Sequence, residues 1–142
     1  TSAGDIERCL HACDTATDEA IAMGIRNNAK LVIAAPCCQR ELRDQMKGDT
    51  NHVLKGITKF PLLKERLADV VTDGIRSLLL EVSGYSVKAL KFVPSDITPK
   101  NLMIVAFKVK KSDTQIPMQN YLKIKEFFHL NPSLERMLEE KT

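Results

Sequence analysis

Two short runs of the sequence are apolar at every position, and they constrain the fold more than any other feature. Leu31–Ala35 has five consecutive apolar residues and Leu102–Phe107 has six. A strand that is apolar on both faces is typical of a parallel sheet with helices on each side. We therefore expect a covered parallel strand at Lys30–Ala35. The second run predicts a strand over Leu102–Lys110 in the interior of the sheet.

The longest periodic segment predicts a helix over Pro61–Ser83. A proline is tolerated in the first turn of a helix, and Gly84 is a typical C-terminal stop. Arg66 and Arg76 fall on the polar face of this helix, where we expect ion pairs that face the solvent. The expected buried face consists of apolar residues at helical spacing, namely Leu63, Leu67, Val70, Val71, Ile75, Leu78, Leu79 and Val82.

The remaining elements complete an α/β order with a hairpin near its end. Asp14 or Thr15 can cap the first helix, and Asp18 and Glu19 place negative charge in its first turn, where the helix dipole favours it. Residues 48–59 are expected to form a polar loop. The predicted strands are Arg8–Cys13 and Ser86–Val93, and the predicted helices are Asp14–Arg26, Gln39–Lys47, Met118–Phe128 and Ser133–Lys141.

Composition limits the class of protein. The chain has 142 residues, of which 44% are hydrophobic and 27% charged, as in a single globular domain. No apolar run approaches the ~20 residues of a membrane span, and the four cysteines do not make a disulfide scaffold. No secretory signal opens the sequence. We expect a cytoplasmic protein without a membrane partner.

Positive charge is concentrated in one segment. Residues 86–125 hold 8 Lys/Arg and 2 Asp/Glu, although the whole chain has a net charge of +3. Such a segment suits phosphate or nucleic acid. The other interpretation is that these lysines cover the solvent faces of strands, and the sequence leaves both open.

Reactive side chains follow the predicted parallel strands. In open α/β sheets, ligands bind at the carboxyl ends of the strands, so the segments 11–18, 36–39 and 94–101 should share one crevice. All six glycines are isolated, so the sequence has no Gly-rich phosphate-binding loop. The candidate site residues are His11, Cys13, Asp14, Thr15, Pro36, Cys37, Cys38, Lys100 and Asn101.

Each of these candidates has a structural alternative. Asp14 and Thr15 can simply cap the following helix, and Lys100 and Asn101 can form a plain turn after Pro99. For Cys37 and Cys38 three roles stay open: a thiolate nucleophile near a helix N-terminus, a lining for cofactor or substrate, and packing. A disulfide between these neighbours would be strained.

A metal site receives little support from the cysteine pattern. Cys9, His11 and Cys13 alternate along one side of a predicted strand, and Cys37 follows the next one. This spacing lacks the C-x₂-C loop that surrounds a tetrahedral zinc ion. We therefore expect no metal.

Four short motifs, in this order and spacing, resemble the C-terminal half of a class I S-adenosylmethionine-dependent methyltransferase. The branch is the one with a Cys-Cys pair after the fifth strand, which includes a tRNA 2′-O-methyltransferase. The motifs are His11–Ala20, Ala35–Gln39, Glu65–Asp69 and Thr98–Leu102.

The resemblance implies a Rossmann-like fold and a set of roles. The family sheet has the order 3-2-1-4-5-7-6, so this chain would supply a mixed sheet in the order 4-5-7-6 with flanking helices. Residues 1–111 would be the C-terminal half of the domain and 112–142 a helical C-terminal extension. The implied catalytic residues are Asp14, Cys37 and Cys38; the implied cofactor-binding residues are His11, Cys13, Asp14 and Thr15; the implied substrate-binding residues are Pro36, Lys100 and Asn101.

The cofactor implied by the resemblance is S-adenosylmethionine, and the expected acceptor is RNA. In the family the Gly-rich cofactor loop follows the first strand, so we expect this chain to be part of a longer protein. We also expect the chain to be inactive when it is assayed alone. The alternative is an α/β module that binds a partner without catalysis. The strand around Leu10 should then form a sheet edge, covered by the missing N-terminal half or by a second copy.

Overall fold

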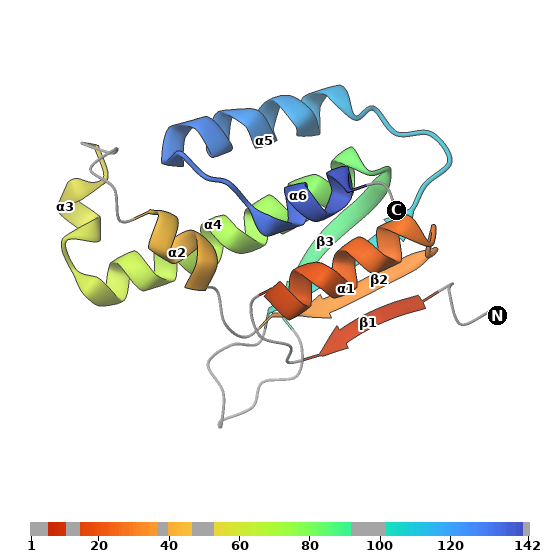
Figure 1. Ribbon diagram of the computed structural model, residues 1–142, viewed down its shortest axis with the longest axis horizontal. Coiled ribbons are helices and arrows are strands. Elements are labelled where there is room, and N and C mark those ends of the chain that lie inside the picture. The colour runs from red at the N-terminus through yellow and green to blue at the C-terminus, as the bar shows by residue number, and fades with distance from the viewer. Residues whose placement is uncertain (1–5, 11–14, 37–39, 47–52, 92–101, 141–142) are drawn as a thin grey trace.

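A computed structural model describes residues 6–10, 15–36, 40–46, 53–91 and 102–140. The chain is a mixed α/β protein (Figure 1). Its elements, in order, are β1 (Ile6–Leu10), α1 (Thr15–Arg26), β2 (Leu31–Ala35), α2 (Arg40–Gln45), α3 (Lys55–Thr58), α4 (Pro61–Val82), β3 (Tyr85–Lys91), β4 (Leu102–Lys108), α5 (Gln115–Phe128) and α6 (Ser133–Glu139).

The four strands form one sheet in the order β1-β2-β4-β3. β1 and β2 are parallel, with Arg8 opposite Ile33. β4 runs antiparallel to both neighbours and places Val105 between Ile33 and Lys88. The expectation that the Leu102 run lies inside the sheet is therefore confirmed, and β1 lies at one end of the sheet.

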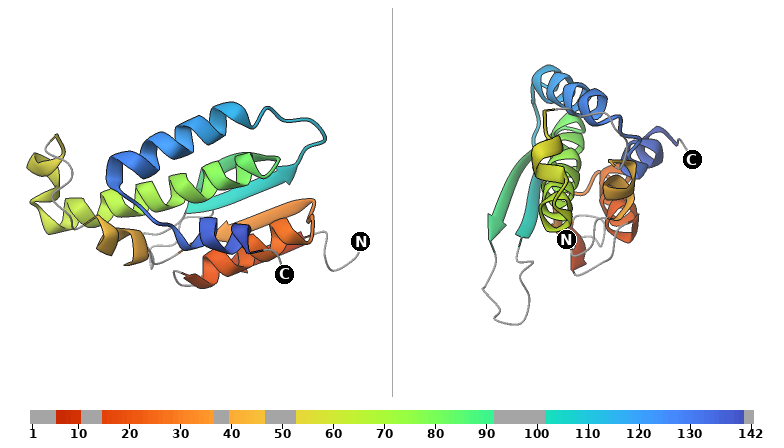
Figure 2. Two further views of the ribbon diagram at one scale, coloured as in Figure 1. Left: turned by 45° about the horizontal axis from the view of Figure 1, so that its top comes forward. Right: turned by 90° about the vertical axis from the view of Figure 1, so that its left-hand side faces the viewer.

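The long helices form a layer on one side of this sheet (Figure 2). α1 packs against β1 and β2, α4 against β3 and β4, α5 on α4, and α6 on α1 and α4. The core lies between the sheet and this layer, and includes Val32, Ile75, Leu80, Ile104 and Leu134. Tyr121 and Leu130 show that α5 and the α5–α6 turn contribute to the same core.

The other face of the sheet differs from the expectation of helices on both sides. Val32 and Ala34 belong to the helix-covered core, so Leu31 and Ile33 point to the opposite face. The described part of the chain places no helix there (Figure 2). Within the described residues, helices therefore cover one face of β2, although its residues are apolar on both faces.

The helix boundaries follow local signals closely. Pro61 occupies the first helical position of α4, and Gly84, with a φ of +94°, ends it as predicted. α1 ends at Arg26, before Asn28 with a φ of +53°. α5 begins three residues earlier than predicted, because Pro117 lies among the first residues of a helix, whose N–H groups have no intrahelical acceptor.

Several other boundaries are corrected. β1 begins at Ile6 instead of Arg8, and its expected last residues, 11–13, lie outside the described residues. β4 ends at Lys108 instead of Lys110, and α3 falls within the segment expected to be a loop. α2 and α6 are shorter than predicted, and β3 begins one residue early, at Tyr85.

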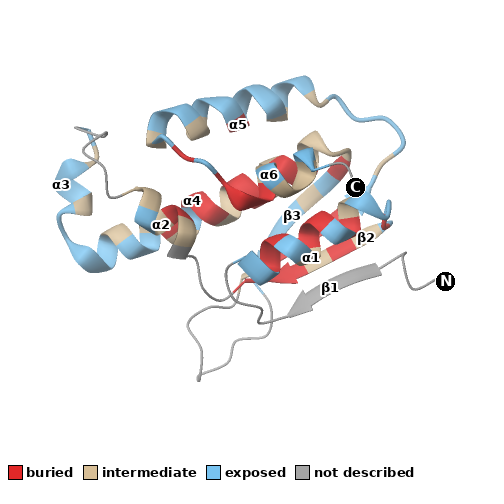
Figure 3. Cartoon of the chain, in the orientation of Figure 1, coloured by how far each residue is buried: buried red, intermediate tan, exposed pale blue. Residues whose placement is uncertain are grey.

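The buried face of α4 is also only partly as predicted. Val71, Ile75 and Leu79 are buried, but Leu63 is 41% and Val70 is 69% exposed. Val70 lies between the buried residues Ala68 and Val71 along the helix, so its side chain is on the outer face. For Leu63 the reason is visible in Figures 1 and 3: the first turns of α4 extend beyond the sheet together with α3. Apolar side chains in this part of the helix therefore meet no strand.

The chain's two tyrosines are both buried, and their hydroxyl groups are satisfied differently. The Tyr85 hydroxyl donates to the carbonyl of Ala29 at 2.7 Å. The Tyr121 hydroxyl has no hydrogen-bond partner among the residues that the structure describes. Burial raises the pKa of both, and the carboxylates of Glu135 and Glu139 raise the pKa of Tyr121 further.

This difference predicts opposite results for two identical substitutions. Tyr85→Phe should lower the free energy of unfolding by about 1–2 kcal/mol, because it leaves the buried Ala29 carbonyl unpaired. Tyr121→Phe should leave it unchanged or raise it by up to about 1 kcal/mol, because no group among the described residues meets hydrogen-bond geometry with the removed hydroxyl. Urea unfolding at pH 7 measures both. A larger loss for Tyr121→Phe than for Tyr85→Phe would contradict the assignment.

Candidate functional site

The candidate segments follow strands that end at one edge of the sheet. β1 and β2 end side by side, with Leu10 opposite Ala35. β3 also runs parallel to β2, because β4 is antiparallel to both, so Lys91 ends β3 at this same edge. The strands that precede the three segments therefore end at one edge, with β4 between the second and the third (Figure 1).

Two candidate residues can be placed. Thr15 is exposed and begins α1, and Pro36 is buried directly after β2. Both lie at the edge where β1 and β2 end. The other candidates lie outside the described residues: His11, Cys13, Asp14, Cys37, Cys38, Lys100 and Asn101.

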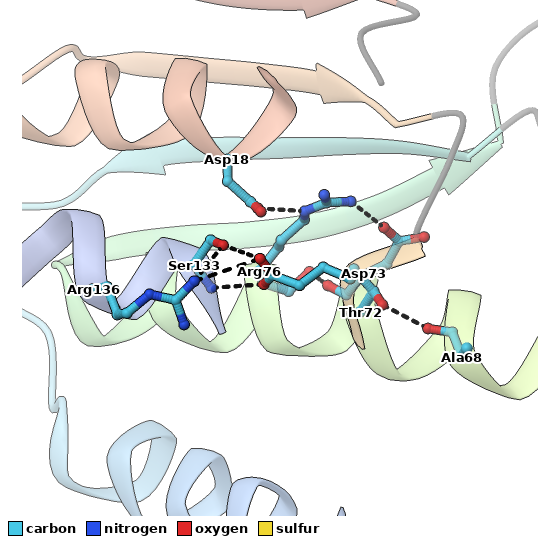
Figure 4. A network of polar contacts seen from close by, with 9 residues as sticks. Asp18, Ala68, Thr72, Asp73, Arg76, Ser133 and Arg136 are labelled. Atoms are coloured by element: carbon cyan, nitrogen blue, oxygen red, sulfur yellow. Dashed lines mark hydrogen bonds and ion pairs between the residues drawn. The ribbon is translucent and has the colours of Figure 1, made fainter. Parts of the chain in front are cut away.

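Next to this edge, the helical layer contains a buried ion pair that joins α1 to α4 (Figure 4). Arg76 Nε donates to Asp18 Oδ1 at 2.8 Å, and the side chains of the two residues are only 1% and 8% exposed. Arg76 Nη1 also donates to Asp73 Oδ1 at 3.3 Å, one turn back along α4. One guanidinium thus holds two carboxylates, as its planar fork of donors allows.

A second polar cluster joins α2 to the start of α6. Glu41 accepts from the backbone N–H of Ser133 at 2.7 Å and also from its hydroxyl. Arg136 donates to the Ser133 hydroxyl and pairs with Glu41 at 3.6 Å. At the other end of α2, Gln45 exchanges two hydrogen bonds with the backbone of Asn131, at 2.7 and 3.0 Å. α2 is therefore fixed to the α5–α6 turn at both ends.

The two clusters face a common cavity of about 10 Å³. Asp18 and Arg76 line it from one cluster and Glu41 from the other, with Thr72 and Pro132 between them. This volume matches a single water molecule. The first turns of α1 and α2, which follow the two candidate segments, are thus held from the same part of the helical layer.

The burial of Arg76 corrects the expectation that it faces the solvent; Arg66 is exposed, as expected. Asp18, the partner of Arg76, was expected to act only through the helix dipole. The signal in the sequence is the spacing of Ala68, Thr72, Arg76 and Leu80, which share one helical stripe. Three of these residues are small or apolar, so the arginine interrupts a stripe that packs inward.

Within the described ranges, no three His, Cys, Asp or Glu side chains gather closely enough to hold a metal ion. Of the residues considered for zinc, Cys9 lies in β1, opposite Ala34, whereas His11, Cys13 and Cys37 lie outside those ranges. No helix among the described residues is both long and apolar enough to cross a membrane.

Comparison with known proteins gives one match. Residues 2–45 match a family model described as a methyltransferase domain. No curated protein and no solved structure matches the chain. The matched span contains β1, α1, β2 and α2, so it includes both segments at the edge and the two anchors, Asp18 and Glu41. The match supports a methyltransferase domain in this part of the chain, and with it a transferase activity of that general kind.

Proposed function

We propose that this chain is the C-terminal half of a class I S-adenosylmethionine-dependent methyltransferase. The match of residues 2–45 to a methyltransferase domain carries the proposal. The sheet supports it, because β1-β2-β4-β3 with β4 antiparallel is the arrangement that strands four, five, seven and six of this fold would have. In this proposal residues 112–142 form an extension whose helices pack back on the domain.

The residues at the edge suit the cofactor's methionine end. Thr15 leaves a hydroxyl exposed where β1 gives way to α1, and Asp14 comes directly before it. Asp14 and Thr15 would hold this end of S-adenosylmethionine, with His11 and Cys13 beside them. The bound cofactor would supply a methyl group on a positively charged sulfur. The first strands of the family fold, upstream of this chain, would provide the remaining contacts.

The chain's own contribution to catalysis is alignment. Transfer of a methyl group proceeds by in-line attack, so holding the acceptor at the correct distance and angle provides much of the rate. Pro36 and at most one of the two cysteines, Cys37 or Cys38, would line the acceptor side, because adjacent side chains point in opposite directions. The thiolate of that cysteine would be available as a nucleophile. Lys100 and Asn101, between β3 and β4, would bind the acceptor itself.

The proposed acceptor is RNA. The lysines of β3 and of the segment after β4 are exposed, namely Lys88, Lys91, Lys110 and Lys111. Lys91 ends β3 at the candidate edge, whereas Lys110 and Lys111 follow β4, which runs the other way, and lie toward the opposite end of the sheet. Exposed lysines favour a phosphate backbone, whose binding weakens steeply with salt. The proposal places the protein in the cytoplasm, where its cysteines stay reduced.

The open side of β1 is part of the same proposal. Among the described strands, β1 pairs with β2 alone, so its other backbone groups would face the position of the family's first strand. The missing N-terminal half, or a second copy of the chain, would cover this edge. The alternative function is a non-catalytic α/β module. A Gly-rich loop after a strand in the upstream sequence would favour the enzyme, and its absence the module.

A calorimetric titration with S-adenosylmethionine tests the proposal. The full-length protein should bind the cofactor, and the 142-residue chain should bind it about 100-fold or more weakly, which corresponds to about 2.8 kcal/mol of lost contacts. S-adenosylhomocysteine should compete in the full-length protein. Low-micromolar binding by the 142-residue chain would contradict the assignment of missing contacts to another part of the fold. A full-length protein that does not bind would remove the methyltransferase proposal.

A further inference from the structure

We propose that residues 53–64, which contain α3 and the first turn of α4, form a docking surface for single-stranded RNA. We call these residues the tip, and all of them lie in the described part of the chain. This inference rests on the proposed function, because it takes RNA as the methyl acceptor and assigns the surface that holds the strand beside the candidate site.

The tip projects past the edge at which β1, β2 and β3 end. Only two residues connect α4 to β3, and the two elements pack against each other. α4 therefore runs back along β3, and its first turns lie toward Lys91, the last residue of β3. Since the 22 residues of α4 span roughly 33 Å and the seven of β3 roughly 23 Å, the start of α4 extends past this edge (Figures 1 and 3).

The base of the tip lies beside the helix that follows β2. α2 begins at Arg40, four residues after Pro36, and packs against α4. Arg43 Nη1 lies 3.9 Å from Glu65 Oε1, the first carboxylate after the tip. A strand of RNA docked on the tip would therefore lie on the side of the molecule where β2 ends.

The surface of the tip combines exposed apolar side chains with positive charge. The sequence from 53 to 64 has three lysines and no acidic residue. Such a surface is complementary to a ligand that offers flat apolar faces together with negative charges. Five large apolar side chains of the tip are exposed, namely Val53, Ile57, Phe60, Leu62 and Leu63.

Phe60 and Lys59 bring the two kinds of contact together. The Phe60 side chain is 50% exposed, and Lys59 Nζ lies 5.1 Å from the centroid of its ring. A base stacked on this ring would place its phosphate near the ammonium. Aromatic stacking beside basic side chains is how proteins bind single strands without sequence preference. The bases of a duplex stack on one another and are not offered to such a ring. The tip therefore suits a single strand.

An anionic bilayer also combines negative charge with an apolar phase, but it fits the tip less well. An interfacial helix places its lysines and its apolar residues on opposite faces. In the tip, Lys59 and Phe60 are adjacent, and α3 has only four residues. Insertion of the ring into hydrocarbon would draw the ammonium after it, at a large cost in desolvation. Stacking on a base has no such cost.

The first experiment measures the Kd of the full-length protein for a fluorescently labelled single-stranded RNA of about 20 nucleotides, longer than most single-strand sites. Fluorescence anisotropy compares the wild type with Phe60→Ala and Phe107→Ala. Phe107 is 46% exposed and pairs with Ser86 at the opposite end of the sheet, so it is the matched control. We expect Phe60→Ala to raise Kd about tenfold and Phe107→Ala to stay within about twofold. With the same RNA as a duplex, Phe60→Ala should also stay within about twofold.

A second pair of variants tests the charges. Lys59→Gln with Lys64→Gln removes two positive charges from the tip, and Lys30→Gln with Lys123→Gln removes two from exposed positions before β2 and on α5. The tip pair should reduce the slope of log K against log salt by about 1.4, because each contact with a single-strand phosphate contributes about 0.7. The control pair should leave the slope unchanged. Circular dichroism checks that each variant is folded.

Several results would overturn the docking surface. They are a wild type that binds no single-stranded RNA, tip variants that bind it as the wild type does, and an equal loss in the matched controls. A Phe60→Ala protein that keeps RNA binding but loses binding to vesicles of phosphatidylcholine and phosphatidylserine would assign the tip to a membrane instead.

The two proposals can fail separately, because RNA binding needs no cofactor. A full-length protein that does not bind S-adenosylmethionine would refute the proposed function, while the anisotropy measurements would still decide the role of the tip. A protein that binds the cofactor and transfers its methyl group to RNA, with tip variants that bind RNA normally, would leave the proposed function in place and refute the docking surface alone.

Discussion

Arg76→Met should lower the free energy of unfolding by about 3–5 kcal/mol, the largest stability change that we expect from any single substitution in this chain. Asp18 would keep its negative charge inside the protein, where its side chain is 8% exposed, without the guanidinium that now lies 2.8 Å away. An unpaired buried charge is far more costly than the intact pair is favourable. Because a domain is stable by only about 5–15 kcal/mol, the loss would be evident in urea unfolding.

Two further variants identify the cause. Arg66→Met changes the same residue type on the same helix at an exposed position, and should alter stability by no more than about 0.5 kcal/mol. Adding Asp18→Asn to Arg76→Met removes the charge of the carboxylate and should recover part of the loss. A double variant no more stable than Arg76→Met would show that packing of the arginine stem, and not the charge, dominates.

The boundaries of α4 could be predicted from the sequence, whereas the environment of Arg76 could not. Pro61 and Gly84 act through local backbone geometry, which is written in neighbouring residues. The burial of Arg76 depends on α1, which approaches it from 58 residues away. Periodicity assigns an arginine to a polar face by default, and only tertiary packing supplies the carboxylate that makes its burial tolerable.

The error at Leu63 has a different cause. Periodicity correctly finds one apolar stripe along a helix, but it does not reveal how far the neighbouring sheet extends. The strands of this sheet have five to seven residues, whereas α4 has 22. At 3.3 Å per strand residue and 1.5 Å per helix residue, the strands span roughly 16–23 Å and the helix roughly 33 Å. The excess length of α4 extends beyond the sheet.

For the candidate site, the sequence predicted the edge of the sheet at which three strands end. The direction of β1, β2 and β3 follows from their order and connections, so the edge at which they end could be found from the sequence. Thr15 and Pro36, the two candidate residues that can be placed, lie at that edge. The anchors Asp18 and Glu41 were missed, because each is held by a residue distant in sequence, Arg76 and Ser133.

Asp14→Ala in the full-length protein should reduce methyl transfer by about 100-fold, while lowering the free energy of unfolding by only about 1 kcal/mol. The residue directly precedes Thr15, the first residue of α1, which is where a capping side chain acts. Loss of a cap explains the small change in stability. The larger change in activity follows from the proposed contact with the cofactor, because misplacement by about 1 Å alone can cost a factor of this size.

Asp14→Asn separates the two roles, because asparagine caps helices about as well as aspartate but carries no charge. If Asp14 holds the positively charged cofactor through its carboxylate, Asp14→Asn should keep wild-type stability and still lose most of the activity. If it only caps α1, Asp14→Asn should match the wild type in both measurements. Initial rates at saturating acceptor, with urea unfolding of the same samples, distinguish these results. Wild-type turnover in Asp14→Ala would leave the residue with its capping role alone, and the cofactor contact at this edge would then have to come from Thr15 or His11.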